Sequence, residues 1–363
     1  EERDRNSNND SEEHRKAFGR QVGISQACRE SIDQIKNNDP TFTEFLSGPY
    51  DAEDFSDSAW ELLGRYIADN HHLYRIDLSF LHSHLTDENM THLFKKLTRS
   101  RSLKKMDLLC NEFGLSGIQS MVPLLKNARS LTNLVIGDNE NINTECFRLV
   151  VEALHGGSIE QLHFSDCEID DVTALEHCTL PHLQIMNLVN NNIQSIPSLE
   201  KYTNLEGLWL GRNKIGKEGC ISIANLLQKE SSSLCGLDID NNDIGDEEAE
   251  ILANSLKHNT KLAVLRLNGN EFKDEGCLAF LKLLNDVSSI ERTYNSNHTL
   301  TTLLLPNFTD PKSTLPLSSI FDERLYFELK KHSNCAKLEK HIASAININV
   351  KNRGNSHAAG RVK

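Results

Sequence analysis

One short pattern recurs nine times in this chain, and it restricts the possible folds more than any other feature. The pattern is Leu-x-x-Leu-x-Leu-x-x-Asn, in which Ile, Met or Phe stands in for Leu in some copies. Successive copies start 30, 28, 28, 24, 22, 29, 28 and 38 residues apart. This near-regular spacing indicates a solenoid, in which each unit buries its apolar face against its neighbours. The copies are Leu73-Ile76-Leu78, Leu103-Met106-Leu108-Asn111, Leu131-Leu134-Ile136-Asn139, Ile159-Leu162-Phe164-Cys167, Leu183-Met186-Leu188-Asn191, Leu205-Leu208-Leu210-Asn213, Leu234-Leu237-Ile239-Asn242, Leu262-Leu265-Leu267-Asn270 and Leu300-Leu303-Leu305.

Each copy predicts a short strand followed by a buried asparagine. In the central Leu-x-Leu, apolar side chains recur with period two, which is typical of a strand with one buried face. The Asn stands where the chain leaves the strand and backbone groups lose their ladder partners. Its side chain both donates and accepts hydrogen bonds, so it can satisfy backbone groups above and below it. We therefore interpret Asn191, Asn213, Asn242 and Asn270 as structural residues.

Helix start signals follow the asparagine position in several copies. Ser116 and Gln119 have the spacing of a capping box before a helix over 118–125. Thr86 precedes two acidic residues and predicts the start of another helix. Asp246 opens a third, because acidic residues in a first turn suit the helix dipole. The expected unit is therefore a strand, a turn and a helix.

This pattern resembles the leucine-rich repeat family, and the copies of 28 to 30 residues resemble its ribonuclease-inhibitor-like branch. Over 73–308, the resemblance implies an α/β solenoid, a horseshoe with parallel strands on its concave face and helices on its convex face. The 22-residue copy that starts at Leu183 leaves room for only a short turn at 193–197 and is more similar to the short-repeat branch. We also expect 285–299 to form an insertion before the last strand.

The flanks of the array predict caps. We expect 1–43, which is polar and mixed in charge, to be a flexible or loosely docked arm. We expect 44–72 to form a helical cap that closes the open end of the solenoid, and 309–363 to form a second helical cap with a basic tail. The apolar residues of the first cap fall on one helical face, which makes them core residues: Trp60, Leu63, Tyr66 and Ile67.

Composition narrows the range of partners and compartments. The net charge of −13 argues against nucleic acid or an anionic membrane as the main partner. No stretch approaches the ~18 apolar residues that span a bilayer. Three of the nine cysteines (Cys146, Cys220 and Cys277) each lie seven residues after a ladder Asn, which predicts equivalent core-facing helix positions. No C-x-x-C pair and no signal peptide are recognisable, although the chain begins at Glu1, so we expect free thiols in a cytoplasmic protein.

Two motifs that could carry chemistry depart from their patterns. Gly211 to Lys217 matches the phosphate-binding loop G-x-x-x-x-G-K, but Glu218 stands where that loop needs Ser or Thr to hold magnesium. Asp238 to Asp243 begins like a calcium-binding loop but lacks the Gly and the final Glu of that motif.

The histidines do not predict a metal site either. The predicted strand over 73–79 separates His71 and His72 from His82 and His84 by on the order of 20 Å. No arrangement of a nucleophile with its base stands out, and neither does a dinucleotide-binding turn. We therefore expect no catalytic residues, no cofactor and no metal ion.

The outward positions of the predicted strands carry the candidate binding site. Trp209 occupies a solvent-facing position bordered by Gly207, Gly211 and Gly236, which predicts an apolar platform with room above it. Trp and Arg are enriched at binding hot spots, and exposed apolar patches usually mark partners. We expect the aspartates to select a basic side chain of that partner. The predicted partner-binding residues are Trp209, Ile185, Val189, Asp238, Asp240 and Arg266.

Two functions remain open at this point. The first is a non-enzymatic scaffold that binds a protein or peptide partner on its concave face, which is common in the family that this chain resembles. The second is a GTPase-activating protein of the Ran-directed kind, which resembles the same branch. That kind carries an acidic tail after its repeats, whereas the tail after Ala336 here is basic, and this favours the scaffold.

Overall fold

The structure, a computed structural model, divides into two compact units. Unit 1 is Glu1–Asn192 and unit 2 is Ile193–Lys363, so the boundary falls inside the 22-residue copy of the repeat. The caps and tail that we expect over 309–363, and nearly all of the insertion at 285–299, lie outside the described residues. The described residues are 11–18, 24–48, 52, 55–98, 100–284, 297, 299–300 and 302–305.

Unit 1 contains a sheet of short parallel strands in one-to-one register. Ile76, for example, lies opposite Phe45 on one side and Met106 on the other, and all three side chains are buried. A separate two-stranded pair joins β3 (His82–Thr86) to β5 (Asn111–Glu112). The strands of the main sheet, in spatial order, are β1 (Glu44–Leu46), β2 (Arg75–Asp77), β4 (Lys105–Asp107), β6 (Asn133–Val135), β7 (Gln161–His163) and β8 (Ile185–Asn187).

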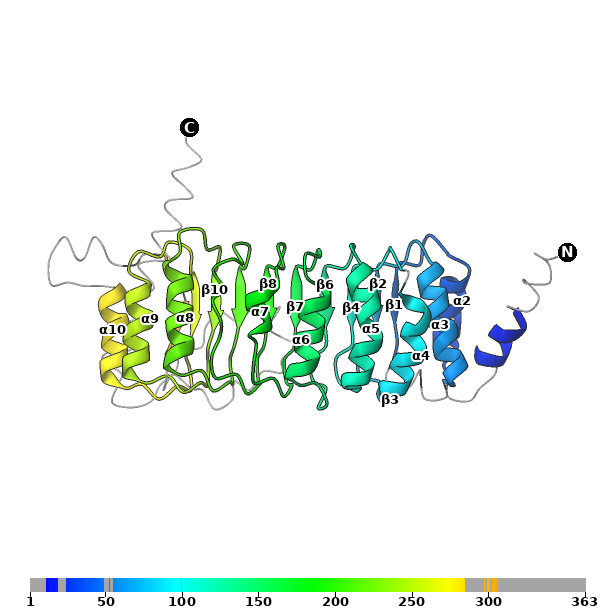
Figure 1. The fold of residues 1–363 in the computed structure, drawn as a ribbon, viewed down its shortest axis with the longest axis horizontal. Helices are drawn as coiled ribbons and strands as arrows, with labels where there is room; N and C mark the ends of the chain where they lie inside the picture. The colour runs from blue at the N-terminus through cyan, green and yellow to red at the C-terminus, as the bar shows by residue number, and fades with distance from the viewer. Residues whose placement is uncertain are drawn as a thin grey trace, which may run out of the picture. The chain divides into compact units, whose positions relative to one another are not determined.

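Helices alternate with these strands along the chain, and Figure 1 shows α3, α4 and α5 side by side. Each presents one apolar face to the core: on α4 the buried residues are Met90, Leu93, Phe94 and Leu97, at the spacing of one helical face. Residues 11–18 are helical, and the labelled helices of unit 1 are α2 (Gln26–Lys36), α3 (Asp57–Asp69), α4 (Asp87–Leu97), α5 (Leu115–Asn127), α6 (Thr144–Ala153) and α7 (Ala174–His177).

Unit 2 repeats the same plan. Its strands are β9 (Gly207–Trp209), β10 (Gly236–Asp238), β11 (Val264–Arg266) and β12 (Thr302–Leu304), and neighbours pair in parallel. Its helices are α8 (Lys217–Gln228), α9 (Asp246–Ser255) and α10 (Asp274–Leu284). Residues 193–206 contain no helix, as the short copy predicts. Each unit is thus an α/β solenoid of parallel strands and helices, which confirms the predicted fold class.

The described part of the N-terminal arm is packed against the core, contrary to the expectation of a loosely docked segment. Helix α2 buries Cys28, Ile32 and Ile35, which recur at the spacing of one helical face. Ser25 caps this helix by accepting a hydrogen bond from the Cys28 N–H at 3.1 Å. Strand β1 then adds to the sheet beside β2. The N-terminal cap therefore includes a strand and two helices, although Trp60 is buried as predicted.

The predicted asparagine ladder is confirmed. The side chain of Asn213 is buried and donates to the carbonyl oxygens of Leu210 at 3.0 Å and Gly211 at 3.3 Å. Its own oxygen accepts from the backbone N–H of Ile193 at 3.0 Å. Equivalent bonds are made by Asn111, Asn139, Asn191, Asn242 and Asn270.

Replacing Asn213 with Ala is expected to destabilise unit 2 by roughly 1–3 kcal/mol. The substitution leaves the Ile193 N–H and two carbonyl groups buried without the partner that now satisfies them. Urea unfolding followed by circular dichroism measures this cost. Asn225→Ala, at an exposed position of α8, is the control and should change stability by less than about 0.5 kcal/mol. Equal costs for the two variants would contradict the ladder role.

The helix starts differ from the predicted caps in one informative way. Ser116 does not form the predicted capping box, because α5 begins at Leu115 and its N-cap is Gly114. Asp87 caps α5 instead: its Oδ1 accepts from the N–H groups of Gly114 and Gly117, each at 2.7 Å. An aspartate at the start of one helix thus caps the next helix along the solenoid.

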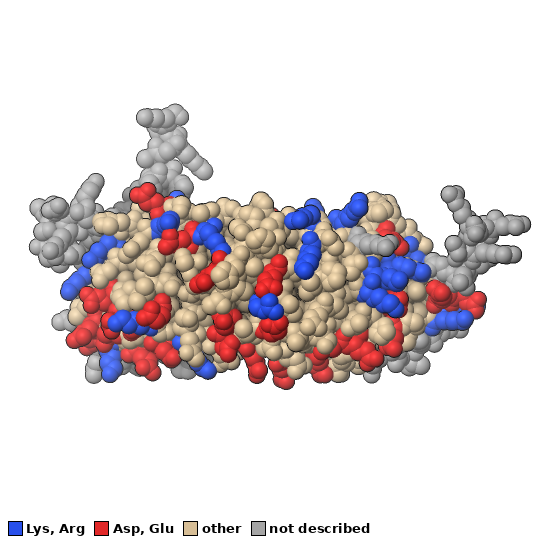
Figure 2. Space-filling view, viewed as in Figure 1, with Lys and Arg blue, Asp and Glu red and all other residues tan. Residues whose placement is uncertain are grey.

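The same arrangement recurs in unit 2, where Asp246 Oδ1 accepts from the N–H groups of Lys273 and Gly276, each at 2.8 Å. Asp246 also opens α9, as predicted. In both units, Asp and Glu side chains gather along the edge where the helices begin (Figure 2). Negative charge there is favourable because helix N-termini carry partial positive charge.

The cysteines of the described residues are all free thiols. Cys146, Cys220 and Cys277 are buried at equivalent helix positions, as their spacing from the ladder predicts. Cys335 lies outside the described residues. Among the helices that the structure describes, none has the length and apolar character needed to cross a bilayer.

Candidate functional site

Four of the six predicted site residues meet on the face of the unit 2 sheet that points away from the core, which we call the open face of unit 2. Trp209, Asp238 and Arg266 lie opposite one another on β9, β10 and β11. Asp240 follows two residues after Asp238. The core-facing leucines that alternate with these residues are fully buried, so the predicted assignment of the strand faces is confirmed: Leu208, Leu237 and Leu265.

The indole ring of Trp209 lies against the backbone of two neighbouring strands. A Cβ atom added to Gly236 would lie 2.7 Å from Cη2 of the ring, and one added to Gly207 would lie 3.1 Å from Cζ2. The side chain is half-buried. These glycines therefore do not leave open space above the sheet, as the sequence suggested. They accommodate the ring, which lies flat enough to contact both strands.

Asp238 and Asp240 are buried, contrary to the expectation that they are exposed at the edge of the platform; each is 7% exposed. The Asp238 carboxylate lies 3.3 Å from Nη1 of Arg266 on the neighbouring strand, and it accepts a hydrogen bond from the backbone N–H of Asp240 at 2.9 Å. Asp240 stands two residues after its strand, where the chain turns toward the ladder Asn. Ser165, at the equivalent place in its own repeat, is buried as well.

Both aspartates hold the guanidinium of Arg266. Its Nη1 lies 3.3 Å from Asp238, its Nη2 lies 3.0 Å from Asp240, and its Nε donates to Asp240 at 3.1 Å. Asn268 adds donors to Asp240 from its backbone N–H and its side-chain amide. The side chain of Arg266 stays 35% exposed. The partly accessible groups of this cluster are therefore the guanidinium and the indole, while both aspartates are buried.

Burial and, second, the nearby Asp238 carboxylate together raise the pKa of Asp240 to about 6, against the opposing effects of Arg266 and Asn268. Burial also raises the pKa of Asp238 above its ordinary value, again opposed by Arg266. Two buried carboxylates so close together repel each other unless a cation lies between them. The two carboxylates therefore need the positive charge of Arg266, and their contacts with the guanidinium fix its position.

The other two predicted site residues, Ile185 and Val189, belong to unit 1. Ile185 is half-buried on β8, opposite Gln161 of β7. Val189 is 5% exposed, so the expectation of a solvent-facing side chain is wrong there. It occupies the same crowded repeat position as Ser165 and Asp240, just after the strand ends.

A second charged cluster, which the sequence did not predict as a site, occupies the open face of unit 1. Arg75 pairs with Asp107 at 2.9 Å, with Asp77 at 3.1 Å and with Glu44 at 3.5 Å. The Tyr74 hydroxyl donates to Glu44 as well. Sequence reasoning missed the cluster because Glu44 lies on β1, a strand that lacks the repeat pattern.

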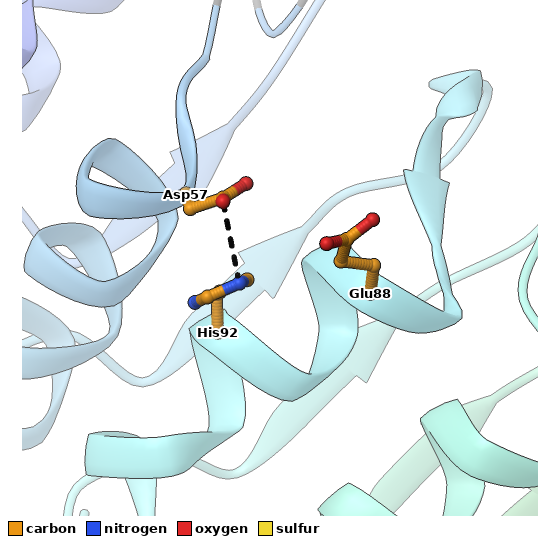
Figure 3. Close-up of side chains that lie close together, drawn as sticks. All are labelled: Asp57, Glu88 and His92. Carbon is orange, nitrogen blue, oxygen red and sulfur yellow. Dashed lines mark ion pairs between the residues drawn. The ribbon is translucent and has the colours of Figure 1, made fainter.

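A third group lies on the helical side of unit 1. Within the described residues, Asp57, Glu88 and His92 place one carboxylate or imidazole ligand atom each within 4.8 Å of the other two (Figure 3). Part of this group could have been predicted from the sequence, because Glu88 and His92 are four residues apart on one helix and therefore share a face. Asp57 is 31 positions earlier than Glu88, and only helix packing brings it close.

Two parts of the chain match family models. Residues 181–219 match the model described as Leucine Rich repeats (2 copies), and residues 258–281 match the model described as Leucine Rich repeat. The first match covers the 22-residue copy, and the second covers β11 and most of α10.

Known proteins with similar sequences include a homolog of a phosphatase regulatory subunit and a ribonuclease inhibitor. A homolog of the protein phosphatase 1 regulatory inhibitor subunit PPP1R7 from Arabidopsis thaliana is 28% identical over 36% of this chain and 44% of its own length. Mouse (Mus musculus) ribonuclease inhibitor is 26% identical over 48% of this chain and 47% of its own length. The matched part thus spans less than half of each relative.

Among solved structures, an internalin (inlF) from Listeria monocytogenes matches with a TM-score of 0.44 and 16% identity, over 69% of this chain and 70% of that chain. The matched repeats agree with the regular strands, helices and asparagine ladder described above. The chain therefore contains leucine-rich repeats and is similar to proteins of the ribonuclease-inhibitor-like kind.

Proposed function

We propose that this chain is a non-catalytic scaffold that binds a protein or peptide partner on the open face of unit 2, with Trp209 and Arg266 as the main contact residues. The observation that carries the proposal is this partly exposed pair: an indole that lies against two glycines, and a guanidinium held by two aspartates. Leucine-rich-repeat proteins generally act as protein-interaction scaffolds, which supports this class of function.

Preorganisation favours binding at this pair. Immobilising a side chain on binding costs about 0.5–1.5 kcal/mol of conformational entropy. In the folded chain, Trp209 and Arg266 are already held by their neighbours, so binding loses less of this entropy. Trp and Arg are also the residue types that most often carry large shares of binding energy. The rest of the open face serves as the surrounding contact area.

The chemistry of the partner follows from the groups that remain accessible. The guanidinium of Arg266 has five N–H donors. Its contacts with the two aspartates use one donor from each of Nε, Nη1 and Nη2, which leaves one on each Nη. The remaining donors suit a carboxylate or carbonyl oxygen of the partner. The indole suits an apolar or aromatic side chain. Because the aspartates lie beneath Arg266, we propose that they orient it, and not that they select a basic side chain as the sequence suggested.

Trp209→Ala is expected to weaken binding by ~2 kcal/mol or more, which is about 30-fold in Kd, while leaving the fold nearly intact. The experiment captures the partner from the native cell with the wild-type chain, identifies it, and then measures its Kd for the purified wild-type and variant chains. Thermal melting of both chains tests the fold directly.

Leu278→Ala is the matched control, because Leu278 is an exposed apolar residue on α10, away from the strands. It should leave Kd unchanged. If Trp209→Ala unfolds the protein while Kd per folded molecule stays the same, Trp209 is a packing residue and the proposed surface is wrong. If both variants weaken binding equally, the effect is not specific to the open face.

The described residues hold no observation that favours the GTPase-activating alternative, and it stays a prediction of the resemblance. A cytoplasmic location is likewise proposed here, and the free thiols at the eight described cysteines support it.

A further inference from the structure

The group of Asp57, Glu88 and His92 lies where two helices of unit 1 pack together. Asp57 is the first residue of α3, while Glu88 and His92 lie one turn apart on α4. His92 Nε2 is 3.6 Å from Asp57 Oδ2, and the Glu88 carboxylate lies beside this pair (Figure 3). All three ligand atoms are within 4.8 Å of one another. None of the three residues takes part in the proposed binding surface of unit 2.

The packing of α3 on α4 fixes the spacing of these residues independently of any ion. Gly64 on α3 lets the backbone of α4 approach closely: a Cβ there would lie 2.0 Å from the carbonyl oxygen of Leu93. Leu93 directly follows His92. One turn further along, Lys95 pairs with Glu61 across the same two helices at 3.1 Å. Ligands on two rigid, closely packed helices lose little freedom when an ion binds.

Helix N-termini favour the acidic side chains of Asp57 and Glu88, but within the group these two carboxylates face only one imidazole. Asp57 and Glu88 are both acidic, and the pair between Asp57 and His92 carries a charge attraction only when the imidazole is protonated. Glu88 makes no ion pair with any other residue in the described part of unit 1 that would offset its charge. A divalent cation would neutralise both carboxylates while the neutral imidazole acts as a ligand.

We propose that Asp57, Glu88 and His92 bind a divalent transition-metal ion of the zinc class. Four-coordinate zinc holds nitrogen and oxygen ligands at about 2.0–2.1 Å, which puts neighbouring ligand atoms about 3.3 Å apart. The observed 3.6 Å between His92 and Asp57 is close to that separation. Glu88 is exposed, so rotation of its side chain closes the remaining gap.

The ligand types select the class of ion. An imidazole nitrogen suits zinc and its neighbours in the transition series, whereas magnesium and calcium take oxygen ligands. Three protein ligands leave at least one coordination position for water, or for a group from another molecule. The alternative is that Asp57 and His92 form an ordinary ion pair between helices, as Glu61 and Lys95 do.

Zinc titration of the full chain by calorimetry distinguishes these possibilities. Cysteine thiolates also bind zinc, so the titration uses a background in which the two described cysteines that are not buried, Cys110 and Cys235, and also Cys335 are replaced by Ser. We expect one zinc ion per chain. Each of Asp57→Asn, Glu88→Gln and His92→Gln should weaken binding by about tenfold or more.

Two control variants make the test specific. Glu61→Gln removes the neighbouring ion pair with Lys95 between the same two helices, and His71→Gln removes an exposed histidine elsewhere in unit 1. Both should bind zinc like the background chain, and saturating zinc should raise the melting temperature of these controls but not of His92→Gln. No stoichiometric binding in the background chain, or binding that survives the three ligand substitutions, would overturn the proposal. So would an equal loss in the controls.

Discussion

Replacing Gly64 with Ala is expected to destabilise unit 1 by about 3 kcal/mol or more. The added Cβ would lie 2.0 Å from the Leu93 carbonyl oxygen and 3.0 Å from its carbonyl carbon. Both are backbone atoms of α4, so no side-chain rotation relieves the clash, and the two helices have to move apart. In an exposed helix the same change would stabilise by about 1 kcal/mol, since Ala is the better helix former. The sign of the effect therefore tests the close packing.

Urea unfolding of the full chain, followed by circular dichroism, measures the change. Gly216→Ala is the matched control, because a Cβ there meets nothing within 4 Å and the backbone has an ordinary negative φ. We expect the control to cost less than about 1 kcal/mol, the size of an N-cap change. The close contact between α3 and α4 is contradicted if Gly64→Ala is neutral or stabilising. The support that this contact gives to the metal-ligand group would then also be lost.

The strands and the ladder could be predicted because one pattern determines both. Leu-x-Leu sets the strand face and the following Asn sets the turn, so each copy predicts where its strand lies and what its Asn contacts. The structure places β4 at Lys105–Asp107 and the Asn111 side chain on the carbonyls of Leu78 and Leu108, as this pattern requires. Strand β1 carries only Phe45 as a buried residue and lacks the Asn, so nothing in its sequence distinguishes it from a loop.

The candidate site was predictable only in part. Alternation predicts that Trp209, Asp238 and Arg266 share a face, and they do. It does not predict that Asp238 is buried, because that burial depends on side chains of other repeats, such as Arg266, whose guanidinium lies 3.3 Å from the carboxylate. Cross-strand contacts depend on register between repeats that are far apart in sequence.

Contacts between consecutive helices were not predictable for the same reason. Asp87 opens α4 by its own sequence signal, but its role in capping α5 depends on where Gly114 and Gly117 lie in space. The approach of Asp57 to His92 likewise depends on the packing of α3 on α4. Patterns within one repeat predict that repeat, while interactions between repeats need the structure.

His163 of unit 1 should make this protein lose stability in mild acid. It occupies an outward strand position on β7, between Val135 and Asn187 on the adjacent strands, yet it is only 6% exposed. Burial disfavours the charged imidazolium and lowers the pKa of His163 to about 4. In the unfolded chain a histidine has a pKa of about 6.5, so between these two values the unfolded state binds more protons than the folded state.

The free energy of unfolding that depends on this histidine is therefore fully present above about pH 6.5 and is lost as the pH falls toward 4. The expected loss is about 3 kcal/mol. Urea unfolding at several pH values between 7.5 and 4, for the wild-type chain and for His163→Gln, measures it. Titrating groups elsewhere affect both chains, so they cancel in the difference. The wild-type chain should lose about 3 kcal/mol more than the variant, since glutamine cannot gain a proton in this range. Parallel pH profiles would show that the imidazole accepts its proton as readily in the folded protein as in the unfolded chain, and that the packing around β7 is more open than the structure describes.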